Sequence, residues 1–437
     1  MMPTQYKDSG AEWIGRVPNR WEVKPAFSVL DELDERNDRG QVQNVLSLSY
    51  GRIVRRDVES NFGLLPQSFN TYQIVQAGDI VLRLLDLQND HVSLRVGLVP
   101  EEGIVTSAYL SVRPKGGLDF RFAAYLLHAY DLKKVFYSFG GGCRQSMGFE
   151  DLRRLPIPFP SPAEQRRIAG YLDEATGKVD RLVALRRRQM ELLREQRAAL
   201  IQQAVTRGLT PNAPLKDSGL PWLGQIPKHW QMKPLKWCIR SGTSISYGIV
   251  QPGEQVDDGV PFIQTTDISK ESLDVAQLQR TAPEIAAAYP RSRLSNGDVI
   301  LGVRASIGNA HRVGPEFEGV NLSRGIARIA PDARLVLSDY LVHFLRTRSV
   351  GDAWNLVSQG STFSEVSIAN TRELPVLLPP VSEQRNILDF INSETPTFDR
   401  LLSAYTRQLE LLTEYRAALI HECVTGQRAV PAPKARA

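Results

Sequence analysis

The stretch that decides the fold is LPIPFPSPAEQRR at residues 155–167, which returns as LPVLLPPVSEQRN at residues 374–386. The two copies lie 219 residues apart, and RAALI at residues 197–201 returns at residues 416–420 with the same spacing. Similarity of a chain to itself at a fixed spacing indicates an internal repeat. We therefore interpret the chain as two copies of one scaffold.

The beginnings of the two halves also match. KDSG at residues 7–10 returns at residues 216–219, a spacing of 209, so the second half carries about ten more residues between the markers. Similar ends with divergent middles suggest one scaffold that holds two different readers. The same spacing of 209 relates four further positions: Trp13, Gly15, Pro18 and Trp21 return as Trp222, Gly224, Pro227 and Trp230.

The composition describes a globular chain with a slight excess of positive charge. The 437 residues are 42% hydrophobic and 23% charged, with a net charge of +5, which only slightly favours a partner that carries phosphates. No apolar run approaches the ~18 residues of a membrane span, and residues 1–8 do not resemble a signal peptide. We expect a cytoplasmic protein without disulfides or zinc, because the cysteines are few and scattered: Cys143, Cys238 and Cys423.

Short apolar runs broken by Gly, Pro, Asn and Asp follow the beginning of each half. Helical patterns at residues 120–137 and 338–350 lie between these runs. We predict a mixed α/β domain of roughly 150 residues in each half, and hence an α+β fold class. The predicted strands are residues 45–50, 79–82 and 104–106 in the first half, and 261–265 and 298–301 in the second.

Each half closes in a long helix. Ser161 to Glu164 form a capping-box pattern, Gly170 and Thr176-Gly177 are expected to interrupt the first copy, and nothing breaks a helix from 178 to 206. A helix of about 29 residues spans roughly 43 Å. Apolar residues recur at heptad spacing, with Arg186 and Arg197 interrupting the seam. These seam residues are Val179, Val183, Met190, Leu193 and Leu200, and in the second copy Phe398, Leu402, Tyr405, Leu409, Leu412 and Leu419.

Two such helices in one chain most simply pack on each other. Because the chain crosses a whole domain between them, a pseudo-twofold arrangement makes the pair antiparallel. The alternative is that each helix packs separately on its own domain.

Sites for catalysis or cofactors are not evident in the sequence. It lacks a Gly-x4-Gly-Lys-Ser/Thr phosphate loop and a glycine-rich turn that leads from a strand into a helix. Glu22-Val23-Lys24 could end a nuclease site, but its repeat partner Gln231-Met232-Lys233 has no carboxylate, so we favour a solvated strand end. The histidines show no ligand spacing: His91, His128, His229, His311, His343 and His421. The sequence therefore favours a binding module over an enzyme.

The twice-repeated proline motif with Glu-Gln-Arg and a long helix resembles the specificity subunit of type I restriction–modification systems. The motif at the beginning of each half, Lys-Asp-Ser-Gly-x-x-Trp-Ile/Leu-Gly-x-x-Pro-x-x-Trp, resembles it too, and the likeness covers nearly the whole chain. The resemblance implies two target recognition domains in pseudo-twofold tandem repeat, separated by two long antiparallel coiled-coil helices. The implied boundaries are recognition domains at 1–160 and 216–379, spacer helix regions at 161–208 and 380–428, a linker at 209–215, and a disordered tail at 429–437.

The resemblance also implies a function. Each recognition domain would read one half of a split, asymmetric site on double-stranded DNA, and the helices would set the unread gap. The subunit would not be catalytic and would bind no cofactor. It would recruit two methyltransferase subunits that bind S-adenosylmethionine, and through them two restriction and translocase subunits that use ATP and Mg²⁺.

Base reading requires side chains that donate or accept paired hydrogen bonds from protruding loops. A solvated loop or turn residue is the alternative reading at every such position. For Arg186-Arg187-Arg188 we leave open a solvated helix face, a phosphate contact or a contact with a methyltransferase subunit. The candidates are Tyr50, Arg52, Arg55, Arg83, Asn89, His91, Arg144 and Gln145 in the first half, and Tyr247, Gln251, Arg304, Ser306, Asn309, Ser361 and Thr362 in the second.

Two other functions remain open from the sequence alone. One is an enzyme, a fused nuclease or methyltransferase, whose site has escaped recognition. The other is a coiled-coil scaffold that does not bind DNA.

Overall fold

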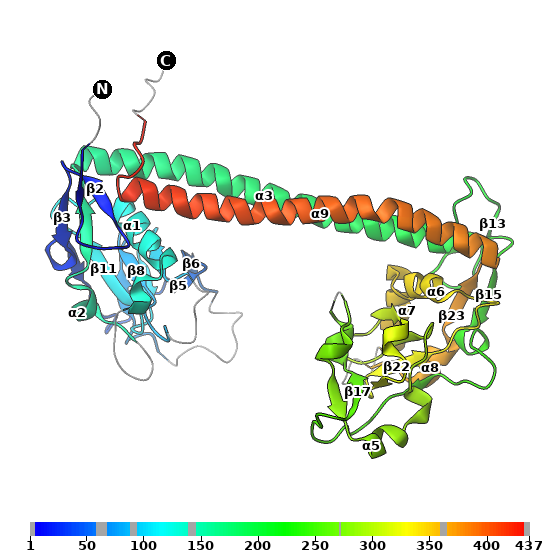
Figure 1. Cartoon of the computed structure of the whole chain (residues 1–437). Coiled ribbons are helices and arrows are strands. Elements are labelled where there is room, and N and C mark those ends of the chain that lie inside the picture. The colour runs from blue at the N-terminus through cyan, green and yellow to red at the C-terminus, as the bar shows by residue number, and fades with distance from the viewer. Residues whose placement is uncertain are drawn as a thin grey trace. The chain divides into compact units, whose positions relative to one another are not determined.

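A computed structural model describes residues 5–57, 68–87, 94–138, 146–270, 272–358 and 365–431 of the chain. The chain divides into two compact units, and each combines a mixed domain with parts of both long helices. The first unit contains Met1–Arg187 and Tyr405–Ala437, and the second contains Arg188–Ala404 (Figure 1).

The first unit is built on antiparallel strands. A hairpin of β1 (Tyr6–Asp8) and β2 (Arg16–Pro18) opens it, and β3 (Glu22–Pro25) pairs with β12 (Pro156–Phe159), which is the first proline motif. The central sheet has the order β4-β11-β8-β9. Its strands are β4 (Leu30–Glu32), β8 (Ile80–Leu82), β9 (Val96–Leu98) and β11 (Leu110–Pro114), and two further pairs are β5 (Leu46–Ser49) with β6 (Arg52–Arg55) and β7 (Gln73–Val75) with β10 (Gly103–Val105).

Helix α1 (Phe120–Leu132) covers this sheet and contacts β9 and β11 (Figure 1). Its N-cap is Asp119, whose carboxylate accepts hydrogen bonds from the amides of Arg121 and Phe122 and so satisfies donors that the first turn leaves unpaired. Phe122, Leu126 and Tyr130 are buried against the sheet at helical spacing. Shorter helical segments are η1 (Ala26–Ser28), η2 (Val135–Ser138) and α2 (Phe149–Leu152).

The second unit repeats this plan. The hairpin of β13 (Leu215–Asp217) and β14 (Gln225–Pro227) opens it, and β15 (Gln231–Pro234) pairs with β23 (Pro375–Leu378), the second proline motif. The central sheet has the order β16-β22-β19-β20, and α6 (Ser338–Leu345) packs on β19 and β20. Its strands are β16 (Ser246–Tyr247), β19 (Val299–Gly302), β20 (Ala310–Arg312) and β22 (Ile326–Ile329).

The middles of the two units differ, as their sequences predict. In the second unit β17 (Val260–Ile263) pairs antiparallel with β18 (Gln279–Thr281) and parallel with β21 (Asn321–Leu322), and a separate small core lies beside them. The remaining helical segments are η3 (Leu235–Trp237), α4 (Thr265–Ile268), η4 (Val275–Gln277), α5 (Pro283–Ala287), η5 (Pro290–Ser292), η6 (Pro315–Phe317), α7 (Arg348–Ser358) and α8 (Ile368–Glu373).

The long helices are α3 (Pro162–Arg207) and α9 (Val381–Val424). The expected interruption of the first copy at Gly170 and Thr176-Gly177 is wrong, because α3 is continuous there. Thr176 donates its hydroxyl to the carbonyl of Leu172, one turn earlier, so it adds a contact within the helix instead of ending it.

Within each unit the segments of α3 and α9 lie side by side. In the first unit Asp180 pairs with Arg416, and Arg186 stacks over the ring of Tyr405, so the residue numbers run in opposite directions along the two helices. In the second unit Arg197 pairs with Asp399. The helices therefore pack on each other in an antiparallel sense, not separately. All the seam residues predicted from the heptad spacing, five on α3 and six on α9, are buried or half-buried.

The C-terminal end of each long helix enters a core. The last turn of α9, with Leu419, Ile420, Cys423 and Val424, belongs to the core of the first unit, where Gly426 (φ +75°) lies against Trp21. The last turns of α3 supply Ile201, Ala204 and Val205 to the core of the second unit, where Gly208 (φ +74°) lies against Trp230. Glycine is the residue that adopts positive φ after a helix without steric cost.

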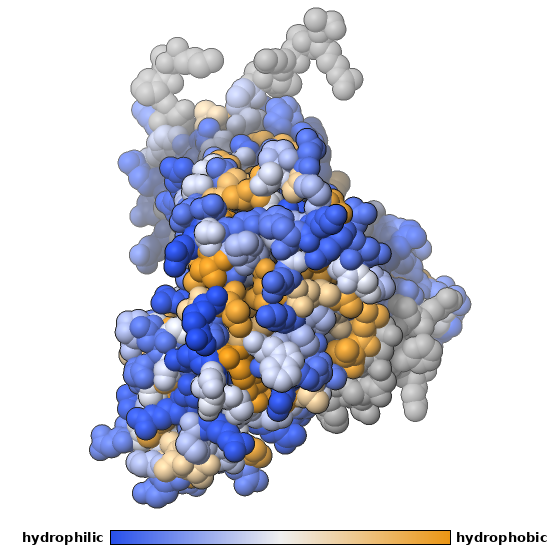
Figure 2. Space-filling model, turned by 90° about the vertical axis from the view of Figure 1, so that its right-hand side faces the viewer, coloured by the Kyte–Doolittle hydropathy of each residue, from blue (hydrophilic) through white to orange (hydrophobic). Residues whose placement is uncertain are grey.

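Hydrophobic and hydrophilic side chains both reach the surface. On the face shown in Figure 2, hydrophobic side chains occur in small areas between hydrophilic ones. In the part of the chain that the structure describes, no helix is both long and apolar enough to span a membrane.

Candidate nucleic-acid interface

The repeated Glu-Gln-Arg motif fixes where each long helix begins. Gln165 is fully buried, and its amide nitrogen donates to the carbonyls of Pro160 (2.8 Å) and Gly117 (3.3 Å). Gln384 is buried in the same way and donates to the carbonyls of Pro379 and Leu335. The motif is therefore structural, and it ties each helix to the domain that precedes it.

The glutamate of the motif contacts the beginning of its own half. Glu164 accepts hydrogen bonds from the indole of Trp21 (3.1 Å) and from Arg20 (2.7 Å). Burial alone would raise the pKa of Glu164, but these donors and the charges of Arg20 and Arg167 hold it below its usual range. Glu383 pairs with His229 instead, at 2.8 Å.

In the first unit, three candidates lie on the β5–β6 hairpin. Tyr50, at the turn, is 89% exposed and has a positive φ of 48°. Arg52 forms an ion pair with Asp180 of α3 at 3.1 Å, and Arg55 forms a two-pronged pair with Glu101. Tyr50 is therefore the most accessible of the three, whereas the two guanidinium groups already have carboxylate partners.

The second group of candidates follows β8. Arg95 is completely buried, and its guanidinium donates to the carbonyls of Arg83 and Leu85, both at 2.9 Å. Its Nε donates to the hydroxyl of Tyr137. Arg95 thus fixes the backbone on which Arg83 lies, a role that no sequence pattern indicated.

Several candidates fall outside the described residues. These are Asn89, His91, Arg144 and Gln145 in the first half, and Ser361 and Thr362 in the second.

In the second unit the two candidates near β16 differ in exposure. Gln251 is exposed after the strand. The hydroxyl of Tyr247 accepts a hydrogen bond from the amide of Ile368 at 3.2 Å, and partial burial raises its pKa above the usual range. Tyr247 therefore joins β16 to α8 and is less available than Tyr50.

Three candidates lie in the tight turn between β19 and β20. Arg304 is close to Glu365, with 3.9 Å between Nε and Oε2, and its side chain is 43% exposed. Asn309 is half-buried, and its backbone N–H donates to the carbonyl of Ser306. Ser306 is only 7% exposed, which weighs against a direct contact with a base.

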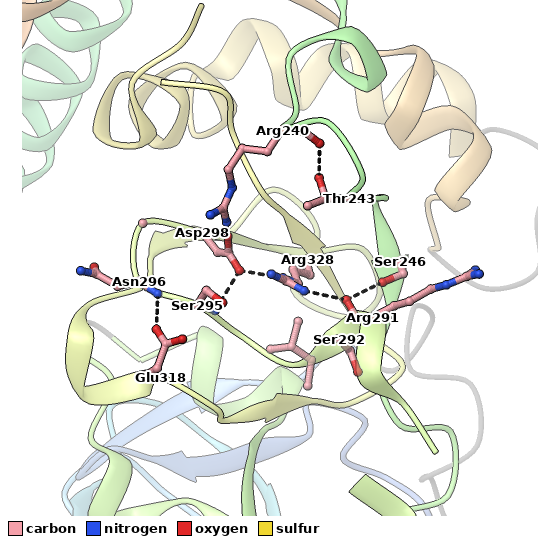
Figure 3. A network of polar contacts seen from close by, with 12 residues as sticks. Arg240, Thr243, Ser246, Arg291, Ser292, Ser295, Asn296, Asp298, Glu318 and Arg328 are labelled. Atoms are coloured by element: carbon pink, nitrogen blue, oxygen red, sulfur yellow. Dashed lines mark hydrogen bonds and ion pairs between the residues drawn. The ribbon is translucent and has the colours of Figure 1, made fainter. Parts of the chain in front are cut away.

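A buried aspartate anchors the beginning of a central strand in both units, β19 in the second and β8 in the first. Asp298 is fully buried and bonded to Arg328 (2.6 Å), to Arg240 and to the amide of Ser295 (Figure 3). Arg328 also donates to the carbonyl of Arg291, and this extends the network from the sheet to η5.

The equivalent position in the first unit is Asp79. It accepts two hydrogen bonds from Arg113, at 2.7 and 2.8 Å, and one from the amide of Gln76. The sequence predicted strands that begin at Asp79 and Asp298, and the repetition of this aspartate at a spacing of 219 was the available signal for a structural carboxylate.

Asp180 connects the first domain to both long helices. It accepts from Arg416 of α9 (3.1 Å) and from Arg52 of the hairpin (3.1 Å). His128 of α1 lies 3.5 Å from Arg416, and burial together with the Arg416 charge lowers its pKa to about 4. His128 is therefore neutral at physiological pH.

The described residues contain no group of three His, Cys, Asp or Glu side chains arranged to hold a metal. Glu22, from the sequence pattern considered for a nuclease, lies exposed on β3 next to Lys24 at 3.2 Å. Cys238 and Cys423 are buried, and burial raises the pKa of each thiol to about 11, so neither is a reactive nucleophile.

Of the three consecutive arginines on α3, two have assigned contacts. Arg186 stacks on Tyr405 with 4.8 Å to the ring centroid, and Arg188 pairs with Glu191 at 3.0 Å. Each unit thus presents polar side chains on loops of its own middle, with the exposed Tyr50 in the first and the exposed Gln251 in the second. Side chains of these types on exposed loops suit contacts with nucleic acid.

Comparison with known proteins agrees with this geometry. Residues 239–410 match the family model of the type I restriction modification DNA specificity domain. The chain is 28% identical to the type I restriction enzyme EcoBI specificity subunit of Escherichia coli, over 53% of this chain and 50% of that protein. The matched region thus spans about half the length of that relative. This chain is also 22% identical to a chain described as a type I restriction enzyme MjaX specificity subunit of Methanocaldococcus jannaschii, over 95% of each chain.

The fold is also found in a solved structure. A chain from work on complex assembly and conformational transition of the type I R-M system superposes with a TM-score of 0.69 at 17% identity. The superposition covers 94% of this chain and 99% of that one, so the likeness of fold extends over both halves.

Proposed function

We propose that the chain is the DNA-reading subunit of a type I restriction–modification system, because it is similar to specificity subunits of such systems. Each half reads one part of a split, asymmetric site on double-stranded DNA. The observation that carries this proposal is the duplication: the two units share a framework but have different middles, with the pairs β5–β6 and β7–β10 in the first and the sheet β18-β17-β21 in the second.

We assign the recognition domains to residues 1–160 and 216–379, and the spacer regions to 161–208 and 380–428. The exposed Tyr50 and Gln251, together with Arg83, Arg304 and Asn309, are the described residues that we assign to DNA contacts. Arg52 and Arg55 would first have to leave their carboxylate partners, so we assign them lower priority.

The long helices act as a ruler in this proposal. A helix rises ~1.5 Å per residue, and one turn of DNA rises about 34–36 Å. Since α3 and α9 have 46 and 44 residues, each helix is long enough to hold two readers more than one turn of DNA apart.

The helices also carry a second apolar stripe that supports docking of methyltransferase subunits. On α3, Leu182, Leu185 and Leu192 are 46%, 53% and 41% exposed. On α9, the residues 219 positions after Leu182 and Leu192 are Leu401 and Leu411, again exposed. Exposed leucines at heptad spacing on a helix that already buries a first seam suit a partner helix.

The subunit itself needs no cofactor in this proposal. S-adenosylmethionine belongs to the methyltransferase subunits, and ATP and Mg²⁺ belong to the restriction and translocase subunits. The complex acts on cellular DNA, and we place it in the cytoplasm.

The experiment that tests the proposal is a methylome. The chain is expressed with the methyltransferase subunit encoded beside it, in a host without DNA methylation, and methyladenine is mapped by single-molecule sequencing. We expect one asymmetric motif in two parts with a fixed unread gap. A continuous motif would contradict the two-reader arrangement, and a soluble complex without new methylation would favour an inactive scaffold. Turnover of plasmid DNA by the purified chain alone, with Mg²⁺ and S-adenosylmethionine, would instead establish an enzyme.

A further inference from the structure

A broad cleft of about 1240 Å³ in the second unit is lined by the last turns of α3 and by the junction of α6 and α7. Its walls are strongly basic. Two carboxylates, Glu195 and Asp399, face it together with five arginines: Arg194, Arg197, Arg207, Arg346 and Arg348.

Most of this positive charge is not neutralised within the described part of the chain. Arg197 pairs with Asp399 at 3.1 Å. The other four arginines of the cleft form neither a side-chain hydrogen bond nor an ion pair with any described residue. Like charges held together in one concave site repel each other, and an anionic ligand would relieve that repulsion.

Among the arginines of the cleft, Arg346 is the one whose positive charge is disfavoured by its surroundings. Partial burial in the cleft and the neighbouring charge of Arg197 lower the pKa of Arg346 below its usual range. Arg346 and Arg348 flank Thr347, whose hydroxyl donates to the carbonyl of Phe344 and so fixes the junction of α6 and α7. The two guanidinium groups are thus presented from a fixed backbone.

The first unit does not repeat this charge. Arg416 and Asp180 stand 219 residues from Arg197 and Asp399 and form the same ion pair. Helix α1 corresponds to α6 at a spacing of 218 residues, because the amides of Asp119 and Leu337 make the equivalent hydrogen bond in the two units. At this spacing the residue that corresponds to Arg346 is His128, which is neutral. The framework therefore does not require an arginine at this place, and the basic cleft is a property of the second unit.

The size and lining of the cleft indicate the class of ligand. Its volume is far larger than one phosphate group needs, and Gln202, Gln203 and Thr206 add polar groups along α3. Guanidinium groups form paired hydrogen bonds with phosphate oxygens. A run of phosphates fits these features.

We propose that this cleft binds backbone phosphates of the DNA duplex and supplies sequence-independent affinity on the side of the second reader. The inference rests on the proposed function, because it assumes that the chain binds DNA. It assigns to Arg346 and Arg348 a positioning role without base readout.

The test measures the salt dependence of DNA binding. The full-length chain is titrated into a fluorescein-labelled random-sequence duplex of 40 base pairs, and anisotropy is followed between 50 and 300 mM KCl. Arg346→Gln with Arg348→Gln should reduce the slope of log K against log salt by about 2 and weaken binding at 100 mM KCl by about tenfold. Arg346→Lys with Arg348→Lys keeps the charges and should keep most of the slope.

The control is Arg334→Gln with Arg372→Gln, which removes two exposed arginines outside the cleft and should leave the slope nearly unchanged. Thermal unfolding of every variant shows whether the fold is retained. A glutamine variant that is folded but keeps the wild-type slope would overturn the proposal. So would weakened binding of the methyltransferase subunit with an unchanged slope, since the cleft would then receive a protein.

The proposed function is tested separately by the methylome of the glutamine variant. Phosphate contacts carry no sequence information, so its motif should equal that of the wild type. A changed motif would show base reading and overturn the phosphate assignment while leaving the proposed function intact. A wild-type chain that binds no duplex even at 50 mM KCl would overturn both.

Discussion

The side-chain oxygen of Gln165 accepts a hydrogen bond of 2.7 Å from the backbone amide of Asp119. Asp119 caps α1 and Gln165 lies in the first turn of α3, so this bond fixes the beginning of one helix against the beginning of another. The second unit repeats it, because Gln384 accepts from the amide of Leu337, which precedes α6, at 2.8 Å.

Replacing Gln165 by alanine should destabilise the first unit. The change leaves the buried carbonyl of Pro160 and the partly buried Asp119 amide and Gly117 carbonyl without their partner, at a cost of about 2–3 kcal/mol, or roughly 5–10 °C in unfolding temperature. Calorimetry of the full chain measures the shift. Gln408→Ala, at an exposed position of α9, is the matched control. Equal unfolding temperatures for the two variants would show that the buried bonds contribute nothing.

The two ion pairs of Asp180 should differ in strength. Arg416 is 28% exposed and Arg52 is 73% exposed, and exposed pairs are weakened by solvent and salt. Double-mutant cycles with Asp180→Asn should give a coupling of about 1 kcal/mol with Arg416→Gln and less than about 0.5 kcal/mol with Arg52→Gln. A larger coupling for Arg52 would mean that the hairpin, not α9, is the principal partner of Asp180.

Stability should depend on pH through His128. The folded protein keeps this imidazole neutral down to a pKa of about 4, whereas the unfolded chain protonates it near 6.5. Its contribution is therefore complete above pH 6.5 and is lost as pH falls from 6.5 towards 4, by at most about 1.4 kcal/mol per pH unit. Urea unfolding at several pH values should show a shallower fall for His128→Gln than for the wild type. The exposed His229→Gln serves as control, and equal slopes for the two variants would contradict the assignment.

The fold was more predictable from the sequence than the site was. The long helices could be predicted from local sequence, because apolar residues such as Met190 and Leu409 recur at spacings of three and four and so share one helix face. The pairs of Asp180 join residues 128 and 236 positions apart, and only the folded chain brings them together. The continuity of α3 through Gly170 was mispredicted because packing of the helix outweighs the modest local cost of a glycine.

Lengthening both helices should lengthen the unread gap. One heptad inserted after Gln189 and one after Gln408, positions 219 residues apart, preserves the seam and adds about 10 Å, or roughly three base pairs. The methylome of this variant should show both half-sites unchanged with the gap enlarged. An unchanged gap would argue against the helices as the ruler.

The second apolar stripe should be needed for the methyltransferase partner. Leu185→Lys combined with Leu411→Lys places two charges on it and should reduce co-purification of the methyltransferase subunit at least tenfold. Ala184→Lys adds a charge at an exposed position of α3 outside the stripe and should have little effect. Retention of the partner by the double variant would show that docking uses another surface.

The last turn of α9 lies in the core of the first unit, and this determines the order in which the two units can complete their folding during synthesis. Leu419, Ile420, Cys423 and Val424 are fully buried there, so the first unit lacks part of its core until the last helix has been synthesised. The second unit, Arg188–Ala404, is translated after the first part of the first unit and before its last part, and this takes roughly 10 to 40 seconds at ordinary elongation rates. The unit that is begun first is therefore completed last, and for that time the hydrophobic residues that later pack on the end of α9 lack this partner, a condition that favours aggregation.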